Sequence, residues 1–538
     1  MTSALPCLAA ILALASARAA TTTRFEEFTR KFEHAPDRAE VVASTFLGST
    51  GTEWLAAGGF QPDGTVVAAG VSLGPDLDLG VKTVVLGTDG PMQAPFRRTR
   101  TTRSGRPELD KNGQPKVDTL GWNHPNATAF IARLSPDLKT IKSVTRFGWK
   151  SGGVTSAAVD GEGNIYLCGP ASNGVASISS DSQEVAASDN RQRPGDCLAV
   201  YLAKISPDAT TALWVRVING PSGAPKLMID KSGKIHLQAQ DFRTFDATGK
   251  LLSTRTIPGG QDGHVAINPV DGTYALGGEH HWPTGREPYR DPTLNIFKPD
   301  GTLLYELYNW DGPLVGLNAL RLVSDSAIRG VTYDHEGNLL IHAWSDGGNS
   351  VMYREPNDVF TTSPRMSGLG FSAWGAGVLS CAYVIKIDPK DYKIAAGTLW
   401  VGYLKDRNKP NSVTINSMGI ARDGSVCVGG GAASSLIQTG NAFPGEPTGN
   451  YVAVMSRDLA SLRFSSTVPA TGQTELNEGA RYGIASGTVN GKTFVLFLSG
   501  ASEREGDRTA PVLNARQEKF AGGFSDGHLL LLDLSAKP

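Results

Sequence analysis

The segment Val159-Asp-Gly-Glu-Gly-Asn-Ile-Tyr-Leu-Cys-Gly169 decides the fold of this 538-residue chain. An apolar stretch leads into an Asp-Gly type of turn, and a second apolar stretch ends in glycine, which is the pattern of a β-hairpin. The phrase occurs seven times, with turn glycines at Gly64, Gly163, Gly233, Gly272, Gly337, Gly424 and Gly491. Because a lone hairpin is marginal in water, seven copies predict a fold in which hairpins pack on one another.

A second hairpin follows each first one, as in Ala203-Lys-Ile-Ser-Pro-Asp208, where an apolar strand enters a turn. Two hairpins make a four-stranded antiparallel blade, so the sequence predicts an all-β, seven-bladed β-propeller. The last blade lacks a fourth strand of its own, and residues 40–48 resemble one. We therefore expect the N-terminal strand to complete the last blade and to remove the open edges of the ring.

These phrases also resemble the SBBP family, the seven-bladed β-propeller repeats common in exported bacterial proteins. The matching positions are Asp160, Gly163, Asn164, Tyr166 and Gly169 in one block, and Ala203, Lys204, Pro207 and Trp214 in the next. The resemblance is clearest over residues 129–218 and fainter over about 40–535. It departs from the family pattern in the third unit, at Ala239, and in the seventh, at Val489. It implies the fold and export, but no shared catalytic residues.

The composition narrows the class of function. Glycine makes up 63 residues, about 12% of the chain, against a usual ~7%, which suits many tight turns. The net charge is -1, so no overall field attracts polyanions, and nucleic-acid binding is disfavoured.

The N-terminus carries a targeting pattern. An apolar run over residues 8–15 precedes Ala17-Arg-Ala19, which predicts a signal peptide over 1–19, a lead-in over 20–39 and one propeller domain over 40–538. No later run is long enough to span a membrane. We expect an exported protein, located in the periplasm, on the cell surface or outside the cell.

Four cysteines remain after the signal peptide. Their spacing matches no CxxC pattern, and the sequence predicts neither a metal site nor a cofactor. Cys168 ends the second strand of its unit and Cys197 opens the third, so antiparallel pairing predicts a disulfide between them. Cys381 and Cys427 belong to neighbouring blades and are expected to be free.

Most of the extra length falls between second and third strands. These connections cover about 71–128, 170–196, 278–292, 344–380, 431–450 and 501–527. They share one face of a propeller, whereas the tight turns share a smooth opposite face. The sequence therefore predicts contacts with a polysaccharide or a protein ligand on the long-loop face, and tolerated insertions are the alternative.

The densest chemistry lies in Glu279-His-His-Trp-Pro-Thr-Gly-Arg-Glu-Pro-Tyr-Arg-Asp291. Candidate catalytic residues are His280, His281, Arg286 and Tyr289. Candidate ligand-binding residues are Trp282, Arg290, Trp344, Tyr353, Arg354 and Trp374. Arginine can pair with a sugar carboxylate, the aromatic rings can stack, and histidine with tyrosine can move protons. Alternatively, these side chains form small cores of their own loops.

Three function classes follow. A non-catalytic binding scaffold is favoured, because no residue set identifies a reaction. The alternative is a polysaccharide lyase or hydrolase that uses residues 280–291. A structural cell-surface component, which would need no chemical site, is the second alternative.

Overall fold

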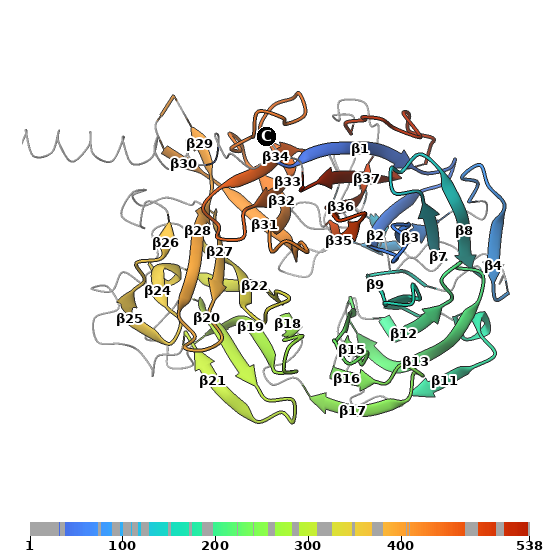
Figure 1. Ribbon diagram of the computed structural model, residues 1–538, viewed down its shortest axis with the longest axis horizontal. Helices are drawn as coiled ribbons and strands as arrows, with labels where there is room; N and C mark the ends of the chain where they lie inside the picture. The colour runs from blue at the N-terminus through green and yellow to red at the C-terminus, as the bar shows by residue number, and fades with distance from the viewer. Residues whose placement is uncertain are drawn as a thin grey trace, which may run out of the picture.

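The computed structural model describes residues 32, 38–73, 77–88, 97–99, 109, 114, 117–119, 128–148, 152–171, 175–185, 197–222, 224–239, 241–256, 264–281, 290–308, 325–346, 350–367, 380–404, 406–407, 409–468, 482–501, 510–523 and 525–535. Seven small, mainly antiparallel sheets form a ring (Figure 1). The predicted all-β, seven-bladed β-propeller is confirmed.

The blades are numbered from the first complete hairpin pair, with strands given from the innermost outward. Blade 1 contains β2 (Glu53–Phe60), β3 (Val66–Ser72), β7 (Thr128–Leu134), β8 (Ile141–Phe147) and β4 (Thr83–Leu86). Blade 2 contains β9 (Ser156–Val159), β10 (Ile165–Pro170), β12 (Cys197–Ile205), β13 (Ala212–Ser222) and β11 (Ser182–Val185). Blade 3 contains β14 (Lys226–Ile229), β15 (Ile235–Gln238), β16 (Asp241–Phe245) and β17 (Leu251–Thr256). Blade 4 contains β18 (His264–Ile267), β19 (Tyr274–His281), β20 (Arg290–Phe297) and β21 (Leu303–Leu307).

Blade 5 contains β22 (Ser326–Tyr333), β23 (Leu339–Asp346), β27 (Ser380–Ile387), β28 (Ile394–Trp400) and β26 (Met366–Ser367). Blade 6 contains β31 (Val413–Ile420), β32 (Val426–Ala432), β33 (Gly449–Met455) and β34 (Leu462–Thr467). Blade 7 contains β35 (Gly483–Val489), β36 (Lys492–Ala501), β37 (Asp526–Asp533) and β1 (Glu40–Leu47). Smaller elements are β5 (Arg97–Thr99), β6 (Val117–Thr119), η1 (Val175–Ile178), η2 (Val351–Tyr353), β24 (Arg354–Glu355), β25 (Asp358–Thr362), β29 (Gly402–Leu404) and β30 (Lys409–Asn411).

The seven turn glycines have the conformation that the hairpin pattern predicts. Their φ angles all lie between 75° and 87°, a region in which a side chain is strained and glycine is not. At Gly64 an added Cβ would also lie 2.5 Å from Val489 of the neighbouring blade. The repeated glycine therefore serves the backbone and the blade packing.

The ring closes as predicted. β1 pairs antiparallel with β37, from Glu40 opposite Asp533 to Leu47 opposite Gly527, and in Figure 1 the first and last strands lie side by side. The N-terminal strand therefore completes blade 7.

Part of the expected lead-in contributes to the core. Phe32 is buried, and its ring lies 5.8 Å from that of Trp400 in an edge-to-face contact. The expected signal peptide over 1–19 lies outside the described residues.

The repeat motif holds the tight turns together. In blade 2 the Asp160 carboxylate accepts a hydrogen bond from the Tyr166 hydroxyl at 3.1 Å, and Lys204 lies 3.9 Å away. In blade 5 Lys386 occupies the same place, 2.9 Å from Asp334. The acidic and basic residues of the motif are therefore structural partners.

The long connections do not all stay on one face. β4, β11 and β26 leave them and pair in parallel with the outermost strands β8, β13 and β28. The expectation that the extra length decorates a single face is corrected, because part of it supplies partners for the N–H and C=O groups of exposed blade edges.

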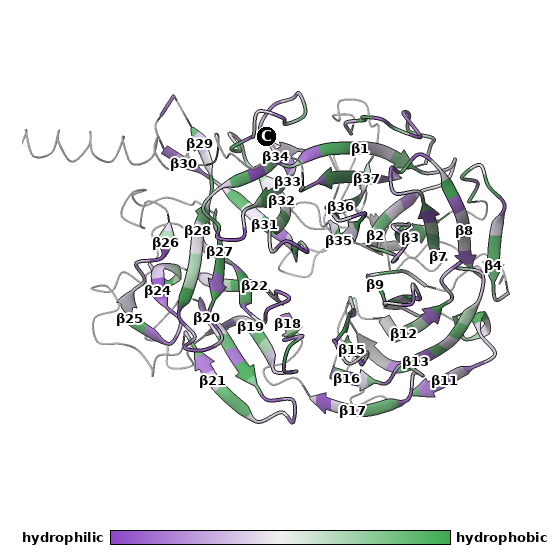
Figure 2. Ribbon diagram, in the orientation of Figure 1, coloured by the Kyte–Doolittle hydropathy of each residue, from purple (hydrophilic) through white to green (hydrophobic). Residues whose placement is uncertain are grey.

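The core lies between neighbouring blades. Figure 2 shows hydrophobic segments along the strands and hydrophilic segments at the turns, and buried residues of adjacent blades form shared clusters. Within the described ranges, no helix is long and apolar enough to cross a membrane.

Candidate functional site

The candidate site lies at the long-loop end of blades 4 and 5. Glu279, near the end of β19, accepts a hydrogen bond from the Arg290 guanidinium at 3.1 Å across the connection of residues 282–289. The backbone N–H of Arg290 donates to the Asp325 carboxylate at 2.9 Å. Asp325 directly precedes β22, so these contacts join the two blades.

A β-bulge brings the second guanidinium to the same place. The pairing of β22 with β23 shifts between Ile328 and Gly330, which leaves Arg329 as the extra residue, and a bulge re-aims the side chain that it carries. One Arg329 nitrogen lies 3.3 Å from Glu279. The guanidinium lies over the Trp344 ring, 5.4 Å from its centroid.

The indole that supports Arg329 is itself held in place. The Trp344 N–H donates to the Ser380 hydroxyl at 2.7 Å. One face of the ring is therefore taken by Arg329 and its polar edge by Ser380. Trp344 positions Arg329, through a cation–π contact typical of arginine over tryptophan.

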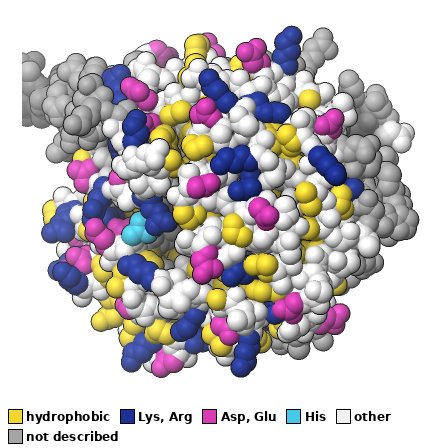
Figure 3. All heavy atoms as spheres, turned by 45° about the vertical axis from the view of Figure 1, so that its right-hand side comes forward, with side chains coloured by type: hydrophobic (Ala, Val, Ile, Leu, Met, Phe, Trp, Pro, Cys, Tyr) yellow, Lys and Arg dark blue, Asp and Glu magenta, His cyan; other side chains and the backbone are white. Residues whose placement is uncertain are grey.

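We name Glu279, Arg290, Asp325, Arg329 and Trp344 the blade 4–5 cluster. Its guanidinium side chains are 40% and 41% exposed, and its carboxylates 26% and 35%. Two positive charges face two negative ones, so the cluster has no net charge. The visible face in Figure 3 likewise intersperses basic and acidic side chains. The cluster offers fixed hydrogen-bond donors and acceptors to solvent and little field for a polyanion.

The structure brings together two of the predicted residues and separates a third. Arg290 and Trp344 meet in the cluster. His280 pairs with Asp291 across β19 and β20, and successive strand residues point to opposite faces, so this pair lies on the other face of blade 4. Asp291 is only 5% exposed. The guanidinium of Arg290 and the imidazole of His280 thus do not converge as the dense loop suggested.

Several predicted residues cannot be placed. The side chain of His281 and the whole of Trp282, Arg286, Tyr289 and Trp374 lie outside the described residues.

Tyr353 and Arg354 serve their own loop. Tyr353 is buried and packs edge-to-face on Tyr383 at 5.8 Å. Arg354 donates to the Phe360 carbonyl at 3.1 Å and reaches the Ser350 hydroxyl at 3.4 Å. These contacts favour the interpretation that Tyr353 and Arg354 form a small core of their own loop, and not a ligand-binding site.

Sequence reasoning missed Arg329 and Asp325 and gave Glu279 no role. One signal was present: an arginine followed by glycine interrupts the strand 326–333, and glycine within a strand often marks a bulge. The partnership across two blades had no signal in the sequence.

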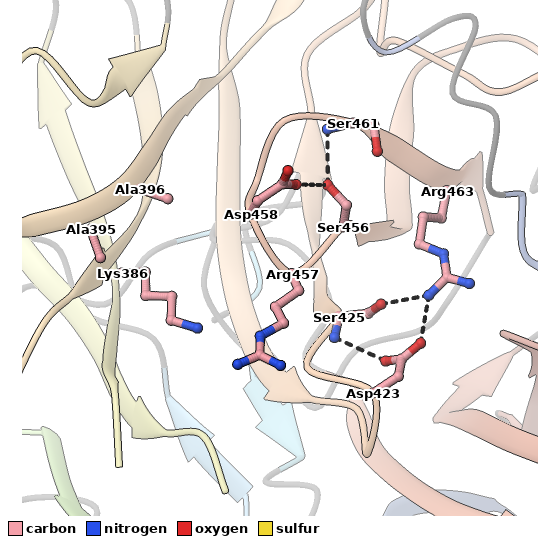
Figure 4. Close-up of a pocket in the computed structure, with 10 residues that line it drawn as sticks. All are labelled: Lys386, Ala395, Ala396, Asp423, Ser425, Ser456, Arg457, Asp458, Ser461 and Arg463. Atoms are coloured by element: carbon pink, nitrogen blue, oxygen red, sulfur yellow. Dashed lines mark hydrogen bonds and ion pairs between the residues drawn. The ribbon is translucent and has the colours of Figure 1, made fainter. Parts of the chain in front are cut away.

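A second candidate lies at the tight-turn end, between blades 5 and 6. This cavity of about 850 Å³ is lined by Lys386, Ala395, Ala396, Asp423, Ser425, Ser456, Arg457, Asp458, Ser461 and Arg463 (Figure 4). The tight-turn face, which was expected to be smooth, therefore carries a cavity between blades 5 and 6.

The charges around this cavity are already used by the fold. Arg463 lies 2.6 Å from Asp423, and Arg457 pairs with Glu336 of blade 5. Asp458 accepts from the hydroxyl of Ser456 in its own turn at 2.6 Å. The cavity therefore presents fewer uncommitted groups than the blade 4–5 cluster.

The predicted disulfide is contradicted. Cys168 is a free, buried thiol opposite Leu202, whereas Cys197 begins β12 five positions away from that pairing, too far for a disulfide. Burial raises the pKa of the Cys168 thiol far above its ordinary value. Cys381 and Cys427 are free, as expected.

A buried acidic pair lies where the ring closes. Glu53 accepts hydrogen bonds from the N–H and hydroxyl of Ser49 at 2.9 and 3.0 Å, and burial raises its pKa. Burial and then the charge of Glu53 raise the pKa of Asp526 to about 7, although Gln517 donates to it at 2.9 Å. Nearby, burial lowers the pKa of His528 to about 4. Neither carboxylate forms an ion pair with a described residue.

Comparisons with known proteins add the following. No family model matches the chain, and no curated protein matches it.

In the described part of the chain, no group of three or more His, Cys, Asp or Glu side chains could hold a metal ion.

Solved propellers do match. The Dos1 propeller is 9% identical with a TM-score of 0.36, covering 92% of this chain and 96% of that one. The WD40 propeller domain of Doa1 is 9% identical with a TM-score of 0.35, covering 76% and 88%. A polysaccharide lyase, an ulvan lyase bound to a GlcA–Rha3S saccharide, is 9% identical with a TM-score of 0.39, covering 85% and 93%. At these values the similarities carry no argument about ligands.

Proposed function

We propose that this protein is an exported, non-catalytic binding scaffold that recognises a neutral polysaccharide through the blade 4–5 cluster. The observation that carries the proposal is the pairing of Glu279 with both Arg290 and Arg329 while the two guanidiniums stay about two-fifths exposed. These groups keep donors available beside an acceptor on a rigid scaffold, where ligand sites are expected.

The charge balance favours a neutral ligand. A sugar hydroxyl donates and accepts at once, so it can bridge a guanidinium and a carboxylate that are already paired. A uronate would have to compete with Glu279 and Asp325 for the same arginines. The predicted pairing of Arg290 with a sugar carboxylate is therefore not the mode we propose.

Binding to immobilised polysaccharides tests the proposal. Neutral and uronate polysaccharides would be compared on the whole protein and on Arg290→Ala and Arg329→Ala. We expect retention on at least one neutral polymer and a loss of at least about tenfold in affinity for each variant, because hydrogen bonds to charged groups contribute about 1.5–3 kcal/mol. Lys142→Ala is the matched control, since this lysine pairs with Asp63 at the tight-turn end. Equal binding by all variants, or binding to uronates alone, would reject the proposal.

Cleavage by a lyase or hydrolase is the second candidate. One observation favours it: His280 and Asp291 are cross-strand neighbours, a pairing that can orient an imidazole for proton transfer. New reducing ends or unsaturated products that disappear in His280→Ala would support it. Retention of a polysaccharide without any cleavage product would instead support the non-catalytic binding scaffold.

A further inference from the structure

The outer edge of most blades is covered by another segment. β4, β11 and β26 pair with the outer strands of blades 1, 2 and 5. In blade 6 the Ser465 carbonyl accepts a hydrogen bond from the Thr439 N–H, and in blade 7 Ser44 exchanges backbone hydrogen bonds with Leu513. Covering an edge in this way satisfies its outward N–H and C=O groups.

The outer strand of blade 3 differs. No backbone hydrogen bond beyond the ladder with β16 joins any residue of β17 to the described part of the chain. Leu251 and Leu252 in this strand are 37% and 48% exposed, and Figure 1 shows β17 on the rim where β11 covers the neighbouring blade. In blade 4 the edge is partly occupied, because Tyr308 donates to the Pro356 carbonyl just beyond β21.

The three covering strands share one register. Each begins opposite the fourth residue of the outer strand, at Val144, Val215 and Gly397. The N–H of Val215 donates to the Asp181 carbonyl at 2.9 Å, and that of Gly397 to the Arg365 carbonyl at 3.2 Å. The fourth residue therefore presents its N–H outward.

Thr254 is the fourth residue of β17 and faces Arg243 of the third strand, as Val215 faces Ala203 in blade 2. The N–H of Thr254 thus points outward from blade 3, at the position where the covered blades bind their extra segment.

A charged side chain also occupies equivalent positions in blades 2 and 3. In blade 2 the next residue, Arg216, binds both oxygens of Asp181, at 3.1 and 3.2 Å, immediately before the covering strand begins. Arg216 also donates to the Gly249 carbonyl in the turn of the next blade at 2.8 Å, and the Arg255 side chain lies near Gly301 in the equivalent turn of blade 4. Arg255 is half-buried and forms no hydrogen bond or close ion pair with a described residue, and its charge adds to the Thr302 hydrogen bonds that lower the pKa of Asp300 in the turn of the next blade.

We infer that the edge of β17 is a docking site for an extended peptide segment of a partner protein. The segment would run parallel to β17 from Thr254 and carry an acidic residue for Arg255 at its start. Its fourth following residue would be apolar, as in Asp181-Ser-Gln-Glu-Val185, where Val185 packs against an inter-blade core. This is strand addition to a sheet edge, with a charge that sets the register.

The geometry favours such a segment over a second copy of this chain. The three covering strands run parallel to the outer strand, and among the described residues that cover an edge only the single bridge of Leu513 to Ser44 in blade 7 is antiparallel. Two copies related by a two-fold axis would pair their edges antiparallel. An edge of six residues is also small against the roughly 1,200 Å² that a stable dimer interface buries. A short extended peptide matches both the direction and the length.

A labelled peptide with the sequence of residues 179–187 is the probe, and fluorescence anisotropy on the whole protein is the measurement. We expect saturable binding that weakens at least about tenfold in Arg255→Ala, because it loses a charge-assisted pair. Thr254→Pro should abolish it, since proline removes the outward N–H and is tolerated at a strand edge. Lys250→Ala is the control, because it removes an exposed charge in the preceding turn and should change nothing.

A charge exchange tests the register. A peptide in which lysine replaces the residue equivalent to Asp181 should fail on the native chain and bind Arg255→Glu. The inference is overturned if the native peptide does not bind, or if it binds equally to Thr254→Pro and Arg255→Ala. It is also overturned if sedimentation shows a dimer that Thr254→Pro converts to a monomer, because a second copy would then be the occupant.

Discussion

The two ends of the propeller strands use charge differently. At the tight-turn end, pairs such as Asp160 with Lys204 and Asp334 with Lys386 recur at equivalent positions of different blades. At the long-loop end the charges do not repeat, as in the blade 4–5 cluster and the Glu53–Asp526 pair. An interaction that recurs at equivalent positions of two blades serves the repeated unit, so the unrepeated charges are the better candidates for function.

The largest expected effect breaks a repeated pair. Lys386→Met should reduce the free energy of unfolding by about 3 kcal/mol, because it leaves the buried Asp334 carboxylate without its cation. Burial alone raises the pKa of Asp334, but the hydrogen bonds from Lys386 and Asn338 outweigh it and lower the pKa. Urea denaturation measures the loss. The double variant Lys386→Met with Asp334→Asn should recover part of it, and a destabilisation below 1 kcal/mol would contradict a structural role for the repeat.

The second prediction concerns the unpaired acid at the other end. The pKa of Asp526 is raised to about 7, so the folded state favours the protonated carboxyl. The stabilisation that this proton gives is fully present below the pKa of an unfolded aspartate, near 4, and is lost as the pH rises through about 7. The stability of Asp526→Asn relative to the native chain should therefore rise with pH, by on the order of 2 kcal/mol between pH 5.5 and pH 8.5.

Comparing the two proteins at each pH removes the contribution of His528, which titrates in both. Its pKa is lowered, so its stabilising effect is lost only as the pH falls below about 6.5. A stability difference that does not vary with pH would contradict the proton on Asp526.

The smallest expected effect on stability is at the candidate site. Arg329→Ala should change the free energy of unfolding by less than about 1 kcal/mol, because its ion pair with Glu279 is substantially exposed. Thermal unfolding would check this on the variant used for polysaccharide binding. A large destabilisation would make the cluster a structural pair like those at the tight turns.

Much of the fold could be predicted because it depends on local rules. Turn glycines such as Gly163 and Gly424 must adopt positive φ, and each showed it. The closing strand was predictable because the last unit lacked a partner. Arg290 and Trp344 were predictable as exposed chemistry beside long connections.

The cluster itself was not predictable, since its members come from two blades and one depends on a bulge at Arg329. The disulfide prediction failed for a related reason. Order along the chain placed Cys168 and Cys197 at the two ends of one connection, but the register set Leu202 opposite Cys168.

By itself the sequence determined the repeat, its turns, its closure and the residues that pair within one unit, because these follow from contacts between near neighbours in the chain. Only the tertiary structure decided which charges meet across blades, where the long connections return to cover an edge, and which edge no described residue covers. Those features depend on how the blades pack around the ring, and a hairpin pattern in the sequence does not specify which residues of other blades will lie beside it.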